Sequence, residues 1–397
     1  MLRQGADIFA DCYNNLLVDM IVNTFRRFYQ TLNLITVNSQ VLIDNFSFWQ
    51  KENPQAKIVP VLKSNAYGHG LELIGRFVDK KIATPFIAVD SLYEAWELEK
   101  TGVSKPILVI GYTLPENFKI LKKLKFHLPI FDQETALVLG RYQPQTKFHL
   151  KIDTGMNRLG IKPNQVNRFI GFLKDHHLEK QVTGIYSHLA CAGSDEDFTQ
   201  KQVAIFKKVI VQFERAGFSF AWKHIAATAG SLTVKDPEFN LIRVGLGFYG
   251  YLPPLVPRQG QALPRIKPAL KLTTRIVQIK AIDKGEIVSY DGQFRAKEKM
   301  AVGVLPIGYY DGLDRRLSVQ GLVRVGSSYC PLVGSICMNI TMIDLSALKK
   351  PFVGQEVVVI DDQTKAKNSL TTLSSLAKTI PYDLLVGLAQ STRRILI

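Results

Sequence analysis

The sequence predicts an α/β protein in two parts, an N-terminal (β/α)8 barrel followed by a C-terminal mainly-β domain. Across residues 33–265, short apolar runs alternate with amphipathic stretches eight times, which is the pattern of such a barrel. Beyond a stretch rich in Pro and Gly, short apolar runs continue but helical periodicity becomes scarce. The 397 residues are also too many for one ordinary compact domain and suit a barrel with a companion domain.

The apolar runs of the first part are short and often β-branched, as expected for strands buried on both faces. They lie at 58–62, 85–89, 107–110, 128–131, 148–152, 182–187, 222–226 and 241–244. Helices are predicted between them at 40–50, 94–100, 133–139, 163–174 and 198–216. Ser91 and Glu94 have the spacing of a capping box at the start of one helix. A doubly wound sheet is the alternative, but it usually has fewer units, and no G-x-G-x-x-G follows the first strand.

The second part has the texture of a β barrel or sandwich. Residues 252–268 form the Pro- and Gly-rich linker that precedes it. Strands are predicted at 272–279, 300–305, 322–325, 340–344 and 356–360, with a helix at 370–378. We therefore divide the chain into an N-terminal extension (1–32), a barrel (33–265) and a mainly-β domain (266–397).

Composition favours a globular cytoplasmic protein. Apolar residues make up 46% and charged residues 21%, which excludes bulk disorder. The net charge is +16, but the Lys and Arg residues are scattered, so we expect a solvated surface and no nucleic-acid partner. The cysteines form no C-x-x-C pair and suit a reducing cytosol: Cys12, Cys191, Cys330 and Cys337.

No apolar run has the length of a membrane span, so no membrane partner is expected. The N-terminal region does contain an apolar stretch at 16–28, which Asp19 interrupts. No cleavage site of small residues follows it, so we interpret it as a short appended helix or an over-long start, and not as a secretory signal.

Lys63 ends the first strand and opens the segment KSNAYGHG at 63–70. In (β/α)8 barrels, residues at the carboxyl ends of the strands build the active site, so this lysine is a candidate amine nucleophile. A lone lysine at a strand end more often extends its amine to solvent. Here Tyr67 follows closely, and Gly68 and Gly70 permit close approach of the backbone to a ligand.

Two further signals lie at the ends of later strands. Arg158 follows the fifth strand in the segment KIDTGMNRLG at 151–160, where a guanidinium can hold an oxyanion in fixed geometry. The loops after strands seven and eight carry ATAGS at 227–231 and RVGLG at 243–247. Barrels often bind phosphate at these two loops through backbone N–H groups.

Together these stretches resemble the successive signatures of alanine racemases. The matching segments are 63–70, 151–160, 243–250, VSY at 288–290, IGYYDG at 307–312, ICM at 336–338 and PY at 381–382, and they occur in the same order. The resemblance extends over residues 33–394. One such motif would be weak evidence, but seven in order are specific.

The resemblance implies that Lys63 forms a Schiff base with pyridoxal phosphate, which acts as an electron sink. It implies that the phosphate is held by Tyr67, Thr228, Gly245, Leu246 and Tyr382. Arg243 would face the pyridine nitrogen, with His188 orienting it. Because arginine stays protonated, that nitrogen would remain unprotonated, which weakens the electron sink and favours racemisation over transamination.

Interconversion of L-alanine and D-alanine requires a base on each face of the substrate. The resemblance implies that Lys63 serves one face and Tyr290 the other. It also implies that Tyr290 comes from the partner subunit of a homodimer, that Met338 binds the substrate carboxylate together with Arg158, and that Tyr309 controls entry. D-alanine would feed peptidoglycan synthesis.

Lys151 matches a family position that is often carbamylated, and the added negative charge would hold Arg158 in place. The chain departs from the family where Ala227 replaces the usual asparagine, Thr228 a serine and Asn339 an aspartate. These departures concern the shape of the pocket and the breadth of substrates more than the class of reaction.

Other functions remain open at this point. A racemase for serine or another amino acid is the nearest, since one methylene discriminates by only about 1–3 kcal/mol. Barrel-type decarboxylases usually place a carboxylate at the pyridine nitrogen, where this chain has Arg243. A non-catalytic carrier of pyridoxal phosphate would have a single domain, and a nucleic-acid-binding protein would show retention on DNA that depends steeply on salt.

Overall fold

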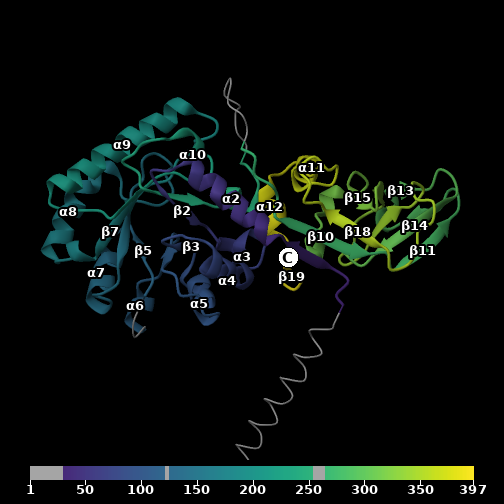
Figure 1. Ribbon diagram of the computed structural model, residues 1–397, viewed down its shortest axis with the longest axis horizontal. Helices are drawn as coiled ribbons and strands as arrows, with labels where there is room; N and C mark the ends of the chain where they lie inside the picture. The colour runs from purple at the N-terminus through teal and green to yellow at the C-terminus, as the bar shows by residue number, and fades with distance from the viewer. Residues whose placement is uncertain (1–29, 121–124, 254–263) are drawn as a thin grey trace, which may run out of the picture.

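The computed structural model describes residues 30–120, 125–253 and 264–397 (Figure 1). The predicted N-terminal extension lies outside the described residues except for 30–32, and so does most of the predicted linker. Within the described residues, no helix has both the length and the apolar character needed to cross a membrane.

The predicted barrel is confirmed, and each of its eight predicted strands is present. The strands are β2 (Lys57–Pro60), β3 (Ile87–Val89), β4 (Ile107–Val109), β5 (Leu128–Ile130), β6 (Phe148–Lys151), β7 (Val182–Tyr186), β8 (Trp222–His224) and β9 (Leu241–Val244). Most of their side chains are buried on both faces, which explains why the sequence shows continuous apolar runs in place of alternation.

Parallel pairing joins these strands in sequence order and closes the barrel. Ladders connect β3 with β4, β5 through β8 in order, and β2 with β9. Single bridges from Val61 to Ala88 and from Leu108 to His127 span the remaining gaps on one side. Between β8 and β9, Arg243 N donates to Ala226 O at 3.1 Å. The carboxyl ends of all eight strands therefore meet at one face.

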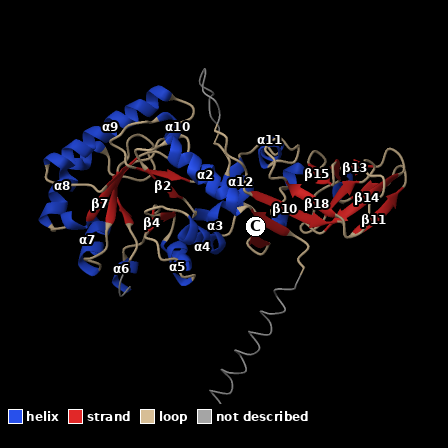
Figure 2. Ribbon diagram, in the orientation of Figure 1, coloured by secondary structure: helices blue, strands red, loops and turns tan. Residues whose placement is uncertain are grey.

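Helices lie outside the barrel strands (Figure 2). The predicted capping box is confirmed, since Ser91 Oγ accepts from Glu94 N and the Glu94 carboxylate returns to the backbone N–H of Ser91. Three of these helices were not predicted from the sequence: α4, directly after the KSNAYGHG segment, and the short helices α6 and α10. The helices are α2 (Ser39–Glu52), α4 (Leu71–Lys81), α5 (Leu92–Lys100), α6 (Glu116–Ile120), α7 (Gln133–Tyr142), α8 (Val166–Asp175), α9 (Glu196–Arg215) and α10 (Gly230–Thr233).

The second domain is mainly β, as predicted, and lies beside the barrel (Figure 1). Its strands are β10 (Leu270–Arg275), β11 (Gln278–Ile282), β12 (Ile287–Val288), β13 (Phe294–Arg295), β14 (Met300–Leu305), β15 (Leu322–Val325), β16 (Ser328–Val333), β17 (Thr341–Asp344) and β18 (Glu356–Ile360). The helices α11 (Leu370–Leu376) and α12 (Pro381–Val386) follow, and α12 packs against the barrel segment that carries Lys63.

The first and last described strands share the sheet of the second domain. β1 (Leu34–Val37) pairs antiparallel with β10 and parallel with β19 (Arg393–Leu396). The predicted barrel range began at residue 33, but the structure places β1 in the other sheet, so the barrel part begins at α2. No local pattern in the sequence indicates this pairing, because the partners of β1 lie far along the chain.

Candidate active site

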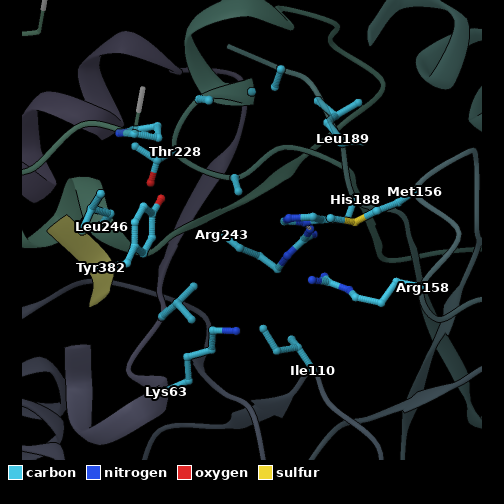
Figure 3. Close-up of a pocket in the computed structure, with 18 of the residues that line it drawn as sticks. Lys63, Ile110, Met156, Arg158, His188, Leu189, Thr228, Arg243, Leu246 and Tyr382 are labelled. Atoms are coloured by element: carbon cyan, nitrogen blue, oxygen red, sulfur yellow. Dashed lines mark hydrogen bonds between the residues drawn. The ribbon is translucent and has the colours of Figure 1, made fainter. Parts of the chain in front are cut away.

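A cavity of about 700 Å³ opens at the carboxyl ends of the barrel strands, the size range of small-molecule sites. Figure 3 shows side chains from several different strands directed around this space. The cavity brings together ten of the thirteen residues predicted for the site. These are Lys63, Tyr67, Lys151, Arg158, His188, Thr228, Arg243, Gly245, Leu246 and Tyr382.

Lys63 begins a left-handed turn, labelled α3 (Lys63–Tyr67). The four residues after the lysine have φ between 52° and 55°, although none is a glycine. Left-handed backbone costs roughly 1–2 kcal/mol per L-residue, so the turn is strained. It changes direction sharply at the end of β2, which brings the Lys63 amine over the barrel mouth, 3.5 Å from Asp90 Oδ1.

His69 holds this turn from inside the barrel wall. Its Nδ1 lies 3.1 Å from Ala66 O and 2.9 Å from Tyr67 O. Both partners are acceptors, so Nδ1 carries the proton and the ring donates to the strained backbone. Complete burial lowers the pKa of His69 to about 4, which keeps the ring neutral at physiological pH.

Arg243 is buried beneath the cavity and is held on several sides. Its Nη2 donates to Ser187 O at 2.9 Å and to His188 Nδ1 at 3.2 Å, and Nη1 donates to His224 Nδ1. His188 thus contacts Arg243, as its predicted orienting role requires, and His224 also accepts a hydrogen bond from Arg243. Burial lowers the pKa of Arg243 to about 10, which leaves it protonated at neutral pH.

A chain of histidines continues from Arg243 through the barrel interior. His224 Nε2 lies 2.9 Å from His149 Nδ1, and His149 Nε2 lies 3.3 Å from His127 Nδ1. Because a guanidinium can only donate, His224 must accept at Nδ1 and carry its proton at Nε2. The same logic fixes the proton of His149 at Nε2. Burial lowers the pKa of both rings well below the usual value, so the chain is neutral.

The cavity floor is strongly cationic. Lys151 and Arg243 both lie over the ring of Tyr186, at 5.5 Å and 5.2 Å from its centroid. Burial, followed by the charges of Arg243 and Arg158, lowers the pKa of Lys151 to about 8. Burial and the same cations lower the pKa of His188 to about 3. These repulsions favour an anionic ligand.

The opposite end of the cavity is neutral and rich in hydroxyls. Figure 3 shows the Thr228 and Tyr382 hydroxyls facing each other. Thr228 Oγ1 also accepts from Gly247 N at 3.3 Å, which ties the loops after β8 and β9 together. A Cβ at Gly245 would lie 2.4 Å from the Tyr67 hydroxyl, so only glycine leaves this space open.

Three predicted site residues lie elsewhere. Tyr290, Tyr309 and Met338 belong to the second domain and do not line the cavity of their own chain. Their exposed fractions are 67%, 43% and 56%. Ser289, directly before Tyr290, has φ of 68° and donates from Oγ to Ser335 O at 2.7 Å, which fixes the backbone that presents the tyrosine.

The comparisons agree with this geometry. The family model "Alanine racemase, N-terminal domain" matches residues 37–253, and "Alanine racemase, C-terminal domain" matches 269–396. The chain belongs to the alanine racemase family. Its similarity covers both domains, including the barrel mouth and the exposed face that carries Tyr290.

Named alanine racemases are similar to this chain along most of its length. That of Halothermothrix orenii is 33% identical over 85% of this chain and 89% of its own. That of Treponema denticola is 33% identical, with coverage of 89% and 96%. The solved alanine racemase of Bacillus anthracis, described with bound L-Ala-P, is 27% identical with a TM-score of 0.84, covering 93% and 96%.

Some residues of this alanine racemase family site were not found from the sequence. His149 and His224 lie on separate strands, and Asp90 follows a third, so no local motif links them. The one available signal was a polar residue between buried apolar ones in a strand, as His149 is between Phe148 and Leu150 in β6. Cys191 also lines the cavity, although no sequence motif marks it as a site residue.

Proposed function

We propose that this chain is a pyridoxal-phosphate-dependent alanine racemase that interconverts L-alanine and D-alanine by a two-base mechanism. The observation that supports it most is the convergence of ten predicted residues on one cavity, with the Lys63 amine at its mouth. In a bacterial cytoplasm, its product would supply D-alanine for peptidoglycan.

The residues present fit pyridoxal phosphate. The neutral end made by Thr228, Tyr382, Tyr67 and the backbone at Gly245 suits a phosphate, which brings its own charge and needs donors. The protonated Arg243 beneath the cavity would donate to the ring nitrogen, and Lys63 would offer its amine for covalent attachment. The chemistry that this cofactor supplies when bound is electron withdrawal from the α-carbon of the amino acid.

Each side chain then has a limited task. Arg243 donates a hydrogen bond and keeps its own proton, since its neutral histidine partners and Ser187 O hold it in one orientation. Arg158 would bind the substrate carboxylate by charge and a paired hydrogen bond. Lys63 Nζ would take or return the α-proton on one face, a step worth roughly 10²–10⁴ in rate.

The base for the other face would be the Tyr290 hydroxyl of a second copy of this chain. Tyr290 and Met338 are exposed and lie outside the cavity of their own chain. An obligatory homodimer would bring both to the partner's cavity, where the Met338 backbone N–H would bind the substrate carboxylate and Tyr309 would control entry. The exposed apolar side chains on this face support an interface.

Carbamylation of Lys151 is part of the proposal. Reaction of an amine with carbon dioxide requires the uncharged amine, and the lowered pKa of Lys151 provides it near neutral pH. A carbamate would introduce a negative charge among Arg158, Arg243 and Lys63, and so relieve the repulsion among these cations.

The first experiment is turnover of L-alanine to D-alanine by the purified protein, next to Lys63→Ala and Tyr290→Phe. We expect activity in the wild type, loss of covalently bound cofactor in the lysine variant, and loss of proton abstraction from L-alanine in the tyrosine variant. A dimer with bound cofactor but no turnover of alanine would contradict the assigned substrate and point to another amino acid.

A further inference from the structure

The strained turn that follows Lys63 is held by side chains from elsewhere in the fold in addition to its own backbone hydrogen bonds. Four consecutive non-glycine residues in the left-handed region would relax toward right-handed backbone if released. His69, within the same segment, holds the middle of the turn. The two ends of the turn are each held by one charged side chain from a different part of the fold.

Glu94 holds the first end. Its Oε1 accepts from Ser64 N at 2.6 Å, directly after the lysine. Its Oε2 accepts from Asp90 N at 2.8 Å and Ser91 N at 3.3 Å, at the start of α5. The capping carboxylate therefore does more than cap its own helix, because it ties the backbone of Lys63 to the end of β3.

Arg394, in β19, holds the second end. Its Nε donates to Gly68 O at 2.8 Å. Its other nitrogens donate to carbonyls of the C-terminal loop, such as Thr392 O at 2.7 Å and Ala389 O at 3.0 Å. The guanidinium thus connects the Lys63 segment with the sheet of the second domain. Burial lowers the pKa of Arg394 to about 10, so it remains charged.

Packing does not hold the outer side of the turn. A groove of about 720 Å³ lies behind it and is lined by Ser64, Asn65, Glu94 and Arg394. Ser64 also lines the active-site cavity, so this stretch of backbone is a thin wall between two open spaces. Without its polar contacts, the turn has room to relax into the groove.

We propose that Glu94 and Arg394 are positioning residues that keep the Lys63 turn in its left-handed form and so set the place of the Lys63 amine. This rests on the proposed function of Lys63 as the cofactor-binding base. Neither side chain lines the active-site cavity. Their effect passes through the Ser64 amide and the Gly68 carbonyl.

The test compares Glu94→Ala with Ser91→Ala in the full-length protein. Both variants remove half of the same capping box, but only Glu94→Ala removes the contact with Ser64. Hydrogen exchange at the Ser64–Tyr67 amides reads the turn directly. We expect faster exchange there in Glu94→Ala, together with a roughly 10²-fold lower kcat and little change in KM. Ser91→Ala should lower the thermal stability but leave the exchange rate of the turn and the kcat at their wild-type values.

Glu94→Gln gives a milder second variant, since its single amide oxygen can accept either from Ser64 N or from the N–H groups at the start of α5, but not from both sides. We expect its exchange and kcat to lie between those of the wild type and Glu94→Ala. Arg394→Ala should also speed exchange in the turn, and the double variant should lose less than the product of the two single losses, because both act on one element.

Equal exchange and equal kcat in Glu94→Ala and Ser91→Ala would overturn the proposal, as the carboxylate would then only cap α5. The proposal would also be overturned if the loss of kcat in the double variant equalled the product of the losses in Glu94→Ala and Arg394→Ala. The exchange measurement needs no cofactor. It therefore remains decisive even where Lys63→Ala keeps racemase activity, a result that would contradict the proposed function instead.

Discussion

The two halves of the proposed site are built in opposite ways. In the barrel, several side chains of the site are buried and held by hydrogen bonds or ring contacts, as Lys151, Arg243 and His224 are. In the second domain, Tyr290 and Met338 stand exposed on short loops beside the sheet. The barrel half is complete within one chain, whereas the other half has only its backbone fixed, as at Ser289.

This difference indicates at which step, folding or association, the unfavourable free energy of forming the site arises. The barrel half bears desolvation and like-charge repulsion while the chain folds, and the pKa values of its lysine and histidines are lowered accordingly. The exposed residues of the second domain lose almost no solvation and face almost no like-charge repulsion until they contact another surface. Folding alone should therefore give a cavity that binds ligand, while turnover should depend on association.

Mixing two inactive variants tests the shared site and has the largest expected effect. Lys63→Ala and Tyr290→Phe proteins should each be nearly inactive. After exchange of subunits, half of the dimers are mixed and each has one intact site, so roughly a quarter of wild-type activity should return. The assay is D-alanine formation before and after mixing. Activity that stays near zero despite proven exchange would show that both bases come from one chain.

Acid should weaken the barrel more than the second domain. Burial lowers the pKa of His69, His127 and His188 to about 4, 4 and 3, while the unfolded chain titrates near 6.5. The unfolded state thus binds more protons below pH 6.5, and stability present above that pH is lost as the pH falls. The loss approaches about 1.4 kcal/mol per histidine per pH unit.

Tryptophan fluorescence measures this loss selectively. Trp49, Trp96 and Trp222 all precede the second domain, and every histidine of the chain does too. Urea unfolding followed by fluorescence should show a clearly lower midpoint at pH 5 than at pH 7. A midpoint that is the same at pH 5 and pH 7 would mean that these histidines accept protons in the folded state as readily as in the unfolded chain.

Carbon dioxide should label the barrel half in a manner that depends on pH. At fixed dissolved carbon dioxide, carbamate on Lys151 should increase as the pH rises through about 8, because the amine loses its proton there. Carbon NMR with labelled bicarbonate detects the adduct, and Lys151→Arg is the control that keeps the charge. A signal that persists in this variant would place the carbamate on another amine.

The smallest effect concerns Ala227, which lines the cavity beside Thr228. Ala227→Asn should change the ratio of kcat/KM for L-serine and L-alanine by less than about tenfold, since small changes in a pocket discriminate weakly. Steady-state assays on both substrates give the ratio. A much larger change would make this position the main determinant of specificity.

Local sequence signals predicted the barrel well and the long-range contacts poorly. The eight strands were found because each is a continuous apolar run, and the site residues were found mainly through the resemblance of segments that follow some of these runs. β1 and β19 were missed, since their pairing joins opposite ends of the chain. The histidine chain was missed because His127, His149 and His224 lie on different strands, and only the barrel brings them together.

The pairing of β1 with β19 determines which residues are needed to express the second domain by itself. Ser39 N donates to Ile397 O at 2.9 Å, and Ile397 N donates to Val37 O at 3.0 Å. The second domain is therefore a discontinuous unit that includes residues from both sides of the barrel. A plasmid encoding only the residues after the linker would omit β1, which lies between β10 and β19 in the sheet, and would leave the edge of β10 unpaired. Co-expression with a separate peptide spanning 30–38 should restore a soluble fragment.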